Sequence, residues 1–114
     1  MIDIEKTAFE NNNAYNLGGA VYGDEVTRIK SSTFMSNSAK DGGAVYTSIM
    51  DQKVTESVFL NNDAHSGDGG AIYFQNTGNV TNCNFTNNKA TEDGGAIYFH
   101  DTGTVTKCNF TNNT

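Results

Sequence analysis

The sequence contains no proline and no tryptophan, and only 2 of its 114 residues are cysteine. Basic residues are also scarce, because 7 lysines and arginines stand against 13 acidic residues and give a formal net charge of −6. A chain with this balance and no basic cluster lacks the positive surface that nucleic acids and anionic membranes attract. We therefore expect neither kind of partner.

Long apolar runs are missing as well. No stretch approaches the roughly 20 residues that a helix needs to span a bilayer, so we expect no membrane insertion in this segment. The first residues also lack the hydrophobic region of a signal peptide. If the native protein is secreted, its signal lies upstream or has been removed. Hydrophobic residues make up only 36% of the chain, and this average alone would be compatible with disorder.

Internal repetition with a period of about 25 residues argues against disorder. One recurring motif is Gly-Gly-Ala, and the other is Phe-x-x-Asn. An aliphatic residue lies five positions before each Phe, a small residue lies two positions before it, and an Ala lies five positions after the first four of them. The motifs begin at Gly18, Gly42, Gly69 and Gly94 and at Phe9, Phe34, Phe59, Phe85 and Phe110.

Each copy predicts three short extended segments. Gly pairs, β-branched residues and Asn runs disfavour helix interiors, and no 3.6-residue period appears. In the fourth copy the segments are about 71–74, 80–81 and 83–85. Asn and Gly tolerate left-handed conformations, which places the corners at Asn76, Gly78, Asn82, Asn87 and Asn88. Tandem units of this kind indicate a solenoid. The predicted fold is all-β, a single parallel β-helix over residues 1–114 with about four and a half coils.

Stacked coils would lie about 4.8 Å apart, so that equal positions of successive copies lie over one another. The Phe residues would form an internal aromatic ladder. The Asn residues would form an amide ladder in which each side-chain carbonyl accepts a hydrogen bond from the amide one coil away. The aliphatic residue after Gly-Gly-Ala is expected to point inward and the following Tyr outward. The opposite phase stays open, because Gly23 and Thr47 occupy the slot of Phe74 and Phe99.

Gly-Gly-Ala-Ile together with Phe-x-x-Asn resembles the paired motif of the polymorphic outer membrane protein repeats, and of adhesin-like surface proteins built from the same unit. The resemblance covers nearly the whole chain. It implies a right-handed β-helix of the pectate-lyase-like type and a non-catalytic, adhesive role at the cell surface or outside the cell. Members of the family are long and carry a signal and an anchor or transporter segment. Because this sequence shows none of these, we expect a fragment of a longer repeat protein.

Asp41, Asp68 and Asp93 precede the last three Gly-Gly pairs and would stack one coil apart. Ca²⁺ takes carboxylate oxygens as ligands and could bridge them. An Asp before Gly-Gly also makes a turn and accepts hydrogen bonds from nearby backbone amides. We favour the turn interpretation and predict no metal and no cofactor.

Cys83 and Cys108 share one column, and stacked neighbours fall within the distance range of a disulfide. Ser32 and Ser57 occupy the same column in other coils. This small-residue environment favours two buried free thiols instead.

Catalysis is the second class of function to consider, because β-helices include polysaccharide lyases and hydrolases. A hydrolase needs paired carboxylates at a set distance, which would interrupt the repeat. The segment 28–30, Arg-Ile-Lys, resembles a substrate-binding motif of the polygalacturonases. The rest of that family's site is absent, and Ile29 is also the core aliphatic residue of its column. His65 and His100 have no partner pattern, so we predict no catalytic residue.

The favoured function is therefore structural and adhesive, with outer faces rich in Asn, Thr and Tyr that contact glycans or proteins. A lyase or hydrolase fragment and a passive spacer are the alternatives. Open coils present unpaired strand edges, so end-to-end or edge-mediated self-association is also expected unless the segment belongs to a longer column. Glycosylation sequons, which arise easily in such repeats, lie at Asn79, Asn84, Asn109 and Asn112. Asn84 and Asn109 would be the better acceptors if they face outward.

Overall fold

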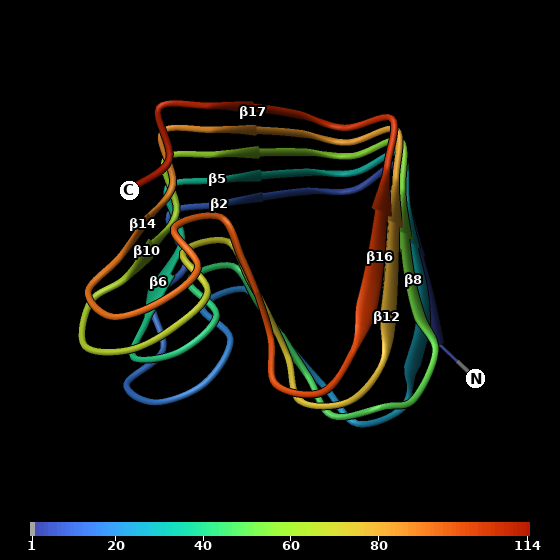
Figure 1. Ribbon diagram of the computed structural model, residues 1–114, viewed down its shortest axis with the longest axis horizontal. Coiled ribbons are helices and arrows are strands. Elements are labelled where there is room, and N and C mark those ends of the chain that lie inside the picture. The colour runs from blue at the N-terminus through green and yellow to red at the C-terminus, as the bar shows by residue number, and fades with distance from the viewer. Residues whose placement is uncertain (1) are drawn as a thin grey trace.

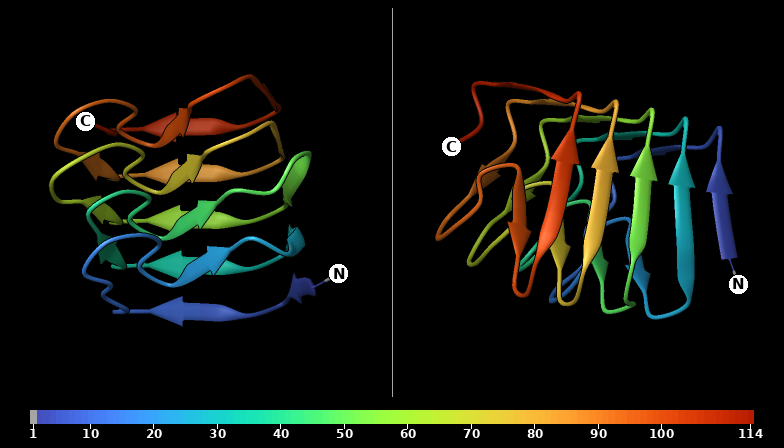
Figure 2. Two further views of the ribbon diagram at one scale, coloured as in Figure 1. Left: turned by 90° about the horizontal axis from the view of Figure 1, so that it is seen from below. Right: turned by 45° about the vertical axis from the view of Figure 1, so that its right-hand side comes forward.

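The computed structural model describes residues 2–114, without the side chains at positions 26 and 27. The described residues form 17 strands and no helix. The chain winds as a coil whose successive turns lie directly over one another (Figures 1 and 2). Every strand pair is parallel, as expected when each strand pairs with its equivalent in the next turn. The structure is the predicted parallel β-helix.

Four sheets line the sides of the coil. In Figure 1 the first sheet lies on the right, the second at the top and the third on the left, and the fourth closes the coil obliquely. The first sheet contains β1 (Ile2–Glu5), β4 (Val26–Lys30), β8 (Gln52–Thr55), β12 (Gly78–Thr81) and β16 (Gly103–Thr106). The second contains β2 (Ala8–Glu10), β5 (Thr33–Met35), β9 (Val58–Leu60), β13 (Asn84–Thr86) and β17 (Asn109–Thr111). The third contains β6 (Ser38–Ala39), β10 (Asp63–Ala64) and β14 (Lys89–Ala90), and the fourth contains β3 (Val21–Gly23), β7 (Val45–Thr47), β11 (Ile72–Phe74) and β15 (Ile97–Phe99).

Two details of the predicted coil are wrong. The third sheet adds a fourth extended segment of only two residues per coil, which is too short to produce an alternating pattern in sequence. Gly78 is not a corner, because it lies inside β12. The predicted corners at Asn82 and Asn87 are confirmed, with φ angles of 54° and 56°.

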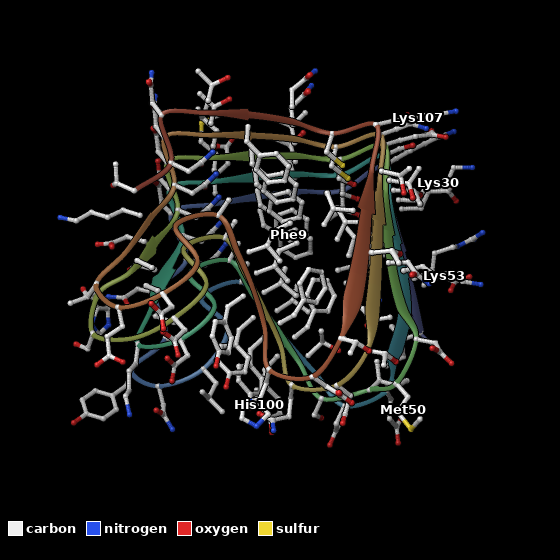
Figure 3. All side chains as sticks on the ribbon, in the orientation of Figure 1. Phe9, Lys30, Met50, Lys53, His100 and Lys107 are labelled. Carbon is white, nitrogen blue, oxygen red and sulfur yellow. The ribbon has the colours of Figure 1, made fainter. Side chains whose placement is uncertain are left out.

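The interior is built from the predicted columns. Ring centroids in the Phe9–Phe34–Phe59–Phe85–Phe110 ladder are separated by 4.9, 4.7, 4.8 and 5.0 Å, with nearly parallel planes. Figure 3 shows Phe9 at one end of this stack, inside the coil, whereas Lys53 and His100 point to the outside. Ile29, Val54 and Val80 are fully buried beside the ladder. Offset stacking adds about 0.5–1.5 kcal/mol per ring pair beyond the burial of area.

The fourth sheet has the expected phase. Val45 and Ile72 are buried, whereas Tyr22 in the neighbouring column is 56% exposed. The position after each tyrosine, which left the phase undecided in the sequence, also faces the interior, because Thr47 and Phe74 are both buried there. The aliphatic residues therefore point inward and the tyrosines outward.

Candidate functional surfaces

The carboxylates of the aspartate column accept hydrogen bonds from backbone amides of the next coil. The amide N–H of Asp68 donates to Asp41 Oδ1 at 2.9 Å, and the amide N–H of Asp93 donates to Asp68 Oδ1 at 2.8 Å. In the first coil Leu17 replaces the aspartate, and the amide of Asp41 bonds instead to the carbonyl of Asn16 at 3.1 Å. Within residues 2–114 no three His, Cys, Asp or Glu side chains are grouped to hold a metal ion. These hydrogen bonds match the turn interpretation of the column.

The tyrosine column forms a ladder on the outer face of the fourth sheet. Rings of Tyr22, Tyr46, Tyr73 and Tyr98 follow one another with centroid distances of 5.6, 4.8 and 4.8 Å. Because neighbouring rings cover one another's faces, the ladder presents mainly ring edges and hydroxyl groups to solvent. The Tyr46 hydroxyl donates to Gln75 Oε1 at 3.0 Å. A row of phenol groups therefore offers hydrogen bonds more readily than aromatic faces.

The phenol groups of Tyr46 and Tyr73 stay protonated at neutral pH. Burial, reinforced by the neighbouring tyrosines, raises the pKa of Tyr73 to about 12, with smaller contributions from Asp41 and Asp68. Burial also raises the pKa of Tyr46 above its usual value. The middle of the Tyr ladder is thus a neutral donor and acceptor surface beside the aspartate column.

Asparagine and threonine cover the last two coils of the first and second sheets. Asn84 and Asn109 lie one above the other on the exposed face, and Asn109 Nδ2 donates to Asn84 Oδ1 at 3.0 Å. Both side chains therefore face outward, which is the condition under which they would be the better sequons. The same faces carry Asn79, Thr81, Thr86, Thr104, Thr106 and Thr111, paired in register across neighbouring strands.

The two cysteines are not bonded to each other. Cys83 is buried, and its amide N–H points to Cys108 Sγ at 3.5 Å, just as the amide of Ser32 donates to Ser57 Oγ at 3.1 Å. Burial raises the pKa of the Cys83 thiol to about 12. Cys108 is only half-buried, because its coil is the last of the column. The free-thiol interpretation agrees with this geometry, and the thiols substitute for hydroxyls in one ladder.

The residues that resembled a polysaccharide-degrading site are not brought together. Arg28 lies on β4 and pairs with Asp3 at 3.1 Å, and Ile29 is fully buried as the core residue of its column. His65 follows the third sheet and contacts Ser66, at 3.0 Å between Nδ1 and Oγ. His100 follows β15 in the fourth sheet, with its ring 6.4 Å from that of Tyr98. These side chains belong to different faces of the coil.

The sequence predicted open ends, and at one of them it missed a pocket. A pocket of about 520 Å³ opens at the last coil between β15, β16 and β17. Its lining residues are Gly95, Ala96, Ile97, Phe99, Val105, Phe110, Asn112 and Asn113. The signal for this pocket is present in the repeat itself, since five Phe-x-x-Asn motifs but only four Gly-Gly-Ala motifs occur.

Comparison with known proteins agrees with this architecture. The family model described as "Right handed beta helix region" matches residues 2–114. Because the match spans nearly the whole chain, the chain belongs to this family of right-handed β-helices. No curated protein and no solved structure matches it significantly. The described residues contain no helix that is long and apolar enough to cross a membrane.

Proposed function

We propose that the chain is a structural, adhesive segment of a cell-surface or extracellular protein, whose outer faces contact glycans or proteins without catalysing a reaction. The observation that carries this proposal is the ordered polar array on the last two coils. There, Asn and Thr side chains of neighbouring strands lie in strict register across both the first and the second sheet. The resemblance of the motifs to polymorphic outer membrane protein repeats and adhesin-like proteins supports the same role.

The array suits weak, repeated contacts. Amide and hydroxyl groups offer donors and acceptors without net charge, and the stacked core fixes their spacing. The last two coils hold three pairs of equal groups about 4.8 Å apart, namely Asn84 with Asn109, Thr86 with Thr111 and Thr81 with Thr106. One extended ligand would therefore meet several equal groups. Modest single contacts then add through effective concentration. Asn84 and Asn109 illustrate the arrangement, since both are exposed and lie at equal positions of paired strands.

The polar columns also favour binding over catalysis. Hydrolases hold two carboxylates at a fixed separation across the scissile bond. Asp41 and Asp68 each use one oxygen to accept a backbone amide of the neighbouring coil, and Asp93 continues the same column. This use of the carboxylates is structural, and it repeats from coil to coil.

A glycan array tests the proposal. The chain, biotinylated and presented on streptavidin for multivalency, is expected to bind a subset of glycans or an immobilised surface protein. Asn84→Lys and Asn109→Lys place charge on the array and should abolish this binding. Asn16→Lys makes the same change on an exposed loop before Gly18 and should leave it intact.

Two results would contradict the proposal in different ways. Release of unsaturated or reducing sugars from pectins and related polymers would identify a lyase or hydrolase. Absence of any multivalent ligand among glycans and surface proteins would leave a passive spacer.

A further inference from the structure

The basic residues, which are scattered along the sequence, are gathered on one side of the coil. Five of the 7 lie on the first sheet or directly after one of its strands: Lys6, Arg28, Lys30, Lys53 and Lys107. Only three acidic residues share these positions, namely Asp3, Glu5 and Glu56. Figure 3 shows Lys30, Lys53 and Lys107 pointing away from the coil on its right-hand side. We call this side, made of the first sheet and the corner that follows it, the basic face.

Two cations of the basic face lie opposite each other. β4 and β8 pair in register, with Arg28 beside Lys53, and like charges at such positions repel. Arg28 pairs instead with Asp3 of β1, on the opposite side from Lys53, at 3.1 Å. Among the described side chains, no carboxylate lies within ion-pair distance of Lys30 or Lys53. The basic face therefore keeps two ammonium groups without a counter-charge from the described part of the chain.

Carboxylates gather on the opposite side of the coil. The third sheet and the loops that join it to the fourth carry Asp41, Asp63, Asp68, Glu92 and Asp93, against Lys40 and Lys89. In Figure 1 these loops lie at the lower left, across the coil from the first sheet. Asp41 and Asp68 each use Oδ1 for a backbone amide, and no basic group of the described residues pairs with either carboxylate. We call this side the acidic face.

We propose that the basic face docks against the acidic face of a second copy of the chain, so that neighbouring columns stand side by side with parallel axes. The charges match in sign and in height. Arg28 and Lys30 belong to the same coil as Asp41, and Lys53 belongs to the same coil as Asp68. A copy displaced sideways, without rotation, therefore brings opposite charges together at both levels. The ammonium groups would donate to the second oxygens of these carboxylates.

The contact uses two different faces of the same molecule. Such a heterologous contact does not close when the copies are related by translation, so it generates open rows instead of dimers. Each exposed ion pair contributes little by itself, but several pairs act together between two rigid columns. Both faces run along the side of the coil and not across its ends.

A free polyanion fits the basic face less well than a second copy does. Four acidic residues lie just before strands of the first sheet, namely Asp24, Glu25, Asp51 and Asp101. A polyanion that crosses the sheet would meet these carboxylates, whereas the aspartate column of a second copy runs along the coil axis and can stay over the lysines. Both copies carry a net charge of −6, but physiological salt screens exposed charges beyond about 8 Å. The local match of the two faces therefore decides the contact.

Sedimentation velocity of the 114-residue chain at several salt concentrations tests the proposal. We expect association in about 0.05 M salt that is lost in about 0.5 M salt, because salt screens exposed ion pairs. Lys30→Glu together with Lys53→Glu should weaken association at least about tenfold. Lys40→Glu together with Lys89→Glu makes the same change in net charge on the acidic face. This matched control should associate at least as strongly as the native chain.

Cross-linking identifies the two faces without any substitution. A carbodiimide joins a lysine ammonium directly to a carboxylate, with loss of water and without a spacer. The principal extents of the molecule are 29, 26 and 25 Å, and the faces lie on opposite sides of it. A link between Lys53 and Asp68 therefore forms only between two copies, and we expect such links at low salt. Asp41→Asn together with Asp68→Asn keeps an oxygen for each backbone amide but removes the charge, and it should weaken association.

The proposal is overturned if the chain stays monomeric at low salt, or if no cross-link joins the two faces. It is also overturned if the variant of Lys40 and Lys89 loses association as the variant of Lys30 and Lys53 does. Binding to heparin that depends on Lys30 and Lys53, without self-association, would assign the basic face to an anionic polymer instead. The inference goes beyond the proposed function, and none of these outcomes depends on glycan binding.

Discussion

At the scale of single residues, the buried asparagines connect the coils through their side chains. Asn62 Nδ2 donates to the Phe34 carbonyl of the coil below at 3.0 Å and to Asn88 Oδ1 of the coil above at 2.9 Å. Its own Oδ1 accepts the backbone amide and Nδ2 of Asn37 at 3.0 and 3.1 Å. One amide thus satisfies a backbone donor and a backbone acceptor that water cannot reach.

Asn62→Ala is therefore expected to lower the free energy of unfolding by about 1–3 kcal/mol, because it leaves the buried Asn37 amide without an acceptor. Asn12→Ala is the matched control at the exposed end of the ladder, where only the Nδ2 bond to Asn37 is lost. This change should cost less than about 1 kcal/mol. Urea denaturation measures both, and equal effects would contradict the capping role of the ladder.

The thiol of Cys83 predicts a loss of stability at alkaline pH. In the unfolded chain the thiol ionises near its ordinary pKa of 9.0, whereas burial raises the pKa to about 12 in the folded chain. The folded state therefore holds the proton more tightly, and stability falls as pH rises from about 9 toward 12. Tyr73, with a pKa raised from 10.0 to about 12, acts in the same direction.

Cys83→Ser isolates the thiol, since serine already occupies this column at Ser32 and Ser57. Under reducing conditions, the drop in melting temperature between pH 8 and pH 10.5 should be smaller for the variant than for the native chain. An equal drop in both proteins would show that the thiol does not contribute. A fold that fails already at pH 8 would contradict the equivalence of serine and cysteine in the column.

At the scale of elements, the side-chain volumes at the end of a fourth-sheet strand and at the start of the following first-sheet strand compensate for each other. An added Cβ at Gly78 would lie 2.5 Å from the ring of Phe74, and one at Gly103 would lie 2.0 Å from the ring of Phe99. One coil lower, Thr47 and Gln52 occupy these two columns, and Thr47 Oγ1 bonds to Gln52 Oε1 at 3.2 Å. A large ring therefore requires glycine at the start of the next strand, and a small hydroxyl residue permits glutamine.

This compensation predicts non-additive substitutions. Gly78→Gln should destabilise by about 1–3 kcal/mol through overpacking, and Phe74→Thr by about 3 kcal/mol through the cavity that it leaves. The double variant recreates the pair Thr47 and Gln52 and should be about 1–3 kcal/mol more stable than the sum predicts. Denaturant midpoints of the four proteins give the coupling, and simple additivity would contradict it.

The sequence predicted those parts of the elements that repeat by residue type. The aromatic, aliphatic and amide columns were readable because each position holds the same chemistry in every coil. The corner between the first and second sheets was harder to predict, because Ser31, Glu56 and Lys107 hold φ angles of 52°, 50° and 53°. These residue types do not signal left-handed backbone, and stacking against the neighbouring coils imposes the conformation. Gly78 was misassigned for a related reason, since its role depends on a ring in another strand.

Candidate surfaces were predictable in part. Outward Asn and Thr columns followed from the inward phase of their neighbours. The use of the aspartates was less certain, because a carboxylate before Gly-Gly is compatible both with a turn that accepts backbone amides and with a cation site. Only the distances from Asp41 and Asp68 to amides of the next coil distinguish these roles.

At the scale of the whole molecule, stability is expected to grow with the number of coils. Interior coils bury their apolar columns completely, as Val54 and Phe59 show, whereas Val105 and Phe110 of the last coil remain about half exposed. In a solenoid each coil contacts only its neighbours, so the free energy of unfolding is approximately a sum of coil and interface contributions. The last coil, which has a neighbour on one side only, contributes least.

Repeating residues 90–114 once after Thr114 should therefore stabilise the chain. The added coil would cover Val105 and Phe110 and continue the Asn ladder from Asn113. Burying the rest of these two side chains contributes about 1–3 kcal/mol, before the new ring and hydrogen-bond contacts are counted. Guanidinium denaturation should show a higher midpoint and a larger m-value, because more surface is exposed on unfolding. A Gly/Ser-rich tail of equal length is the control. An unchanged midpoint, or a separate early transition of the added coil, would show that the coils do not stack additively.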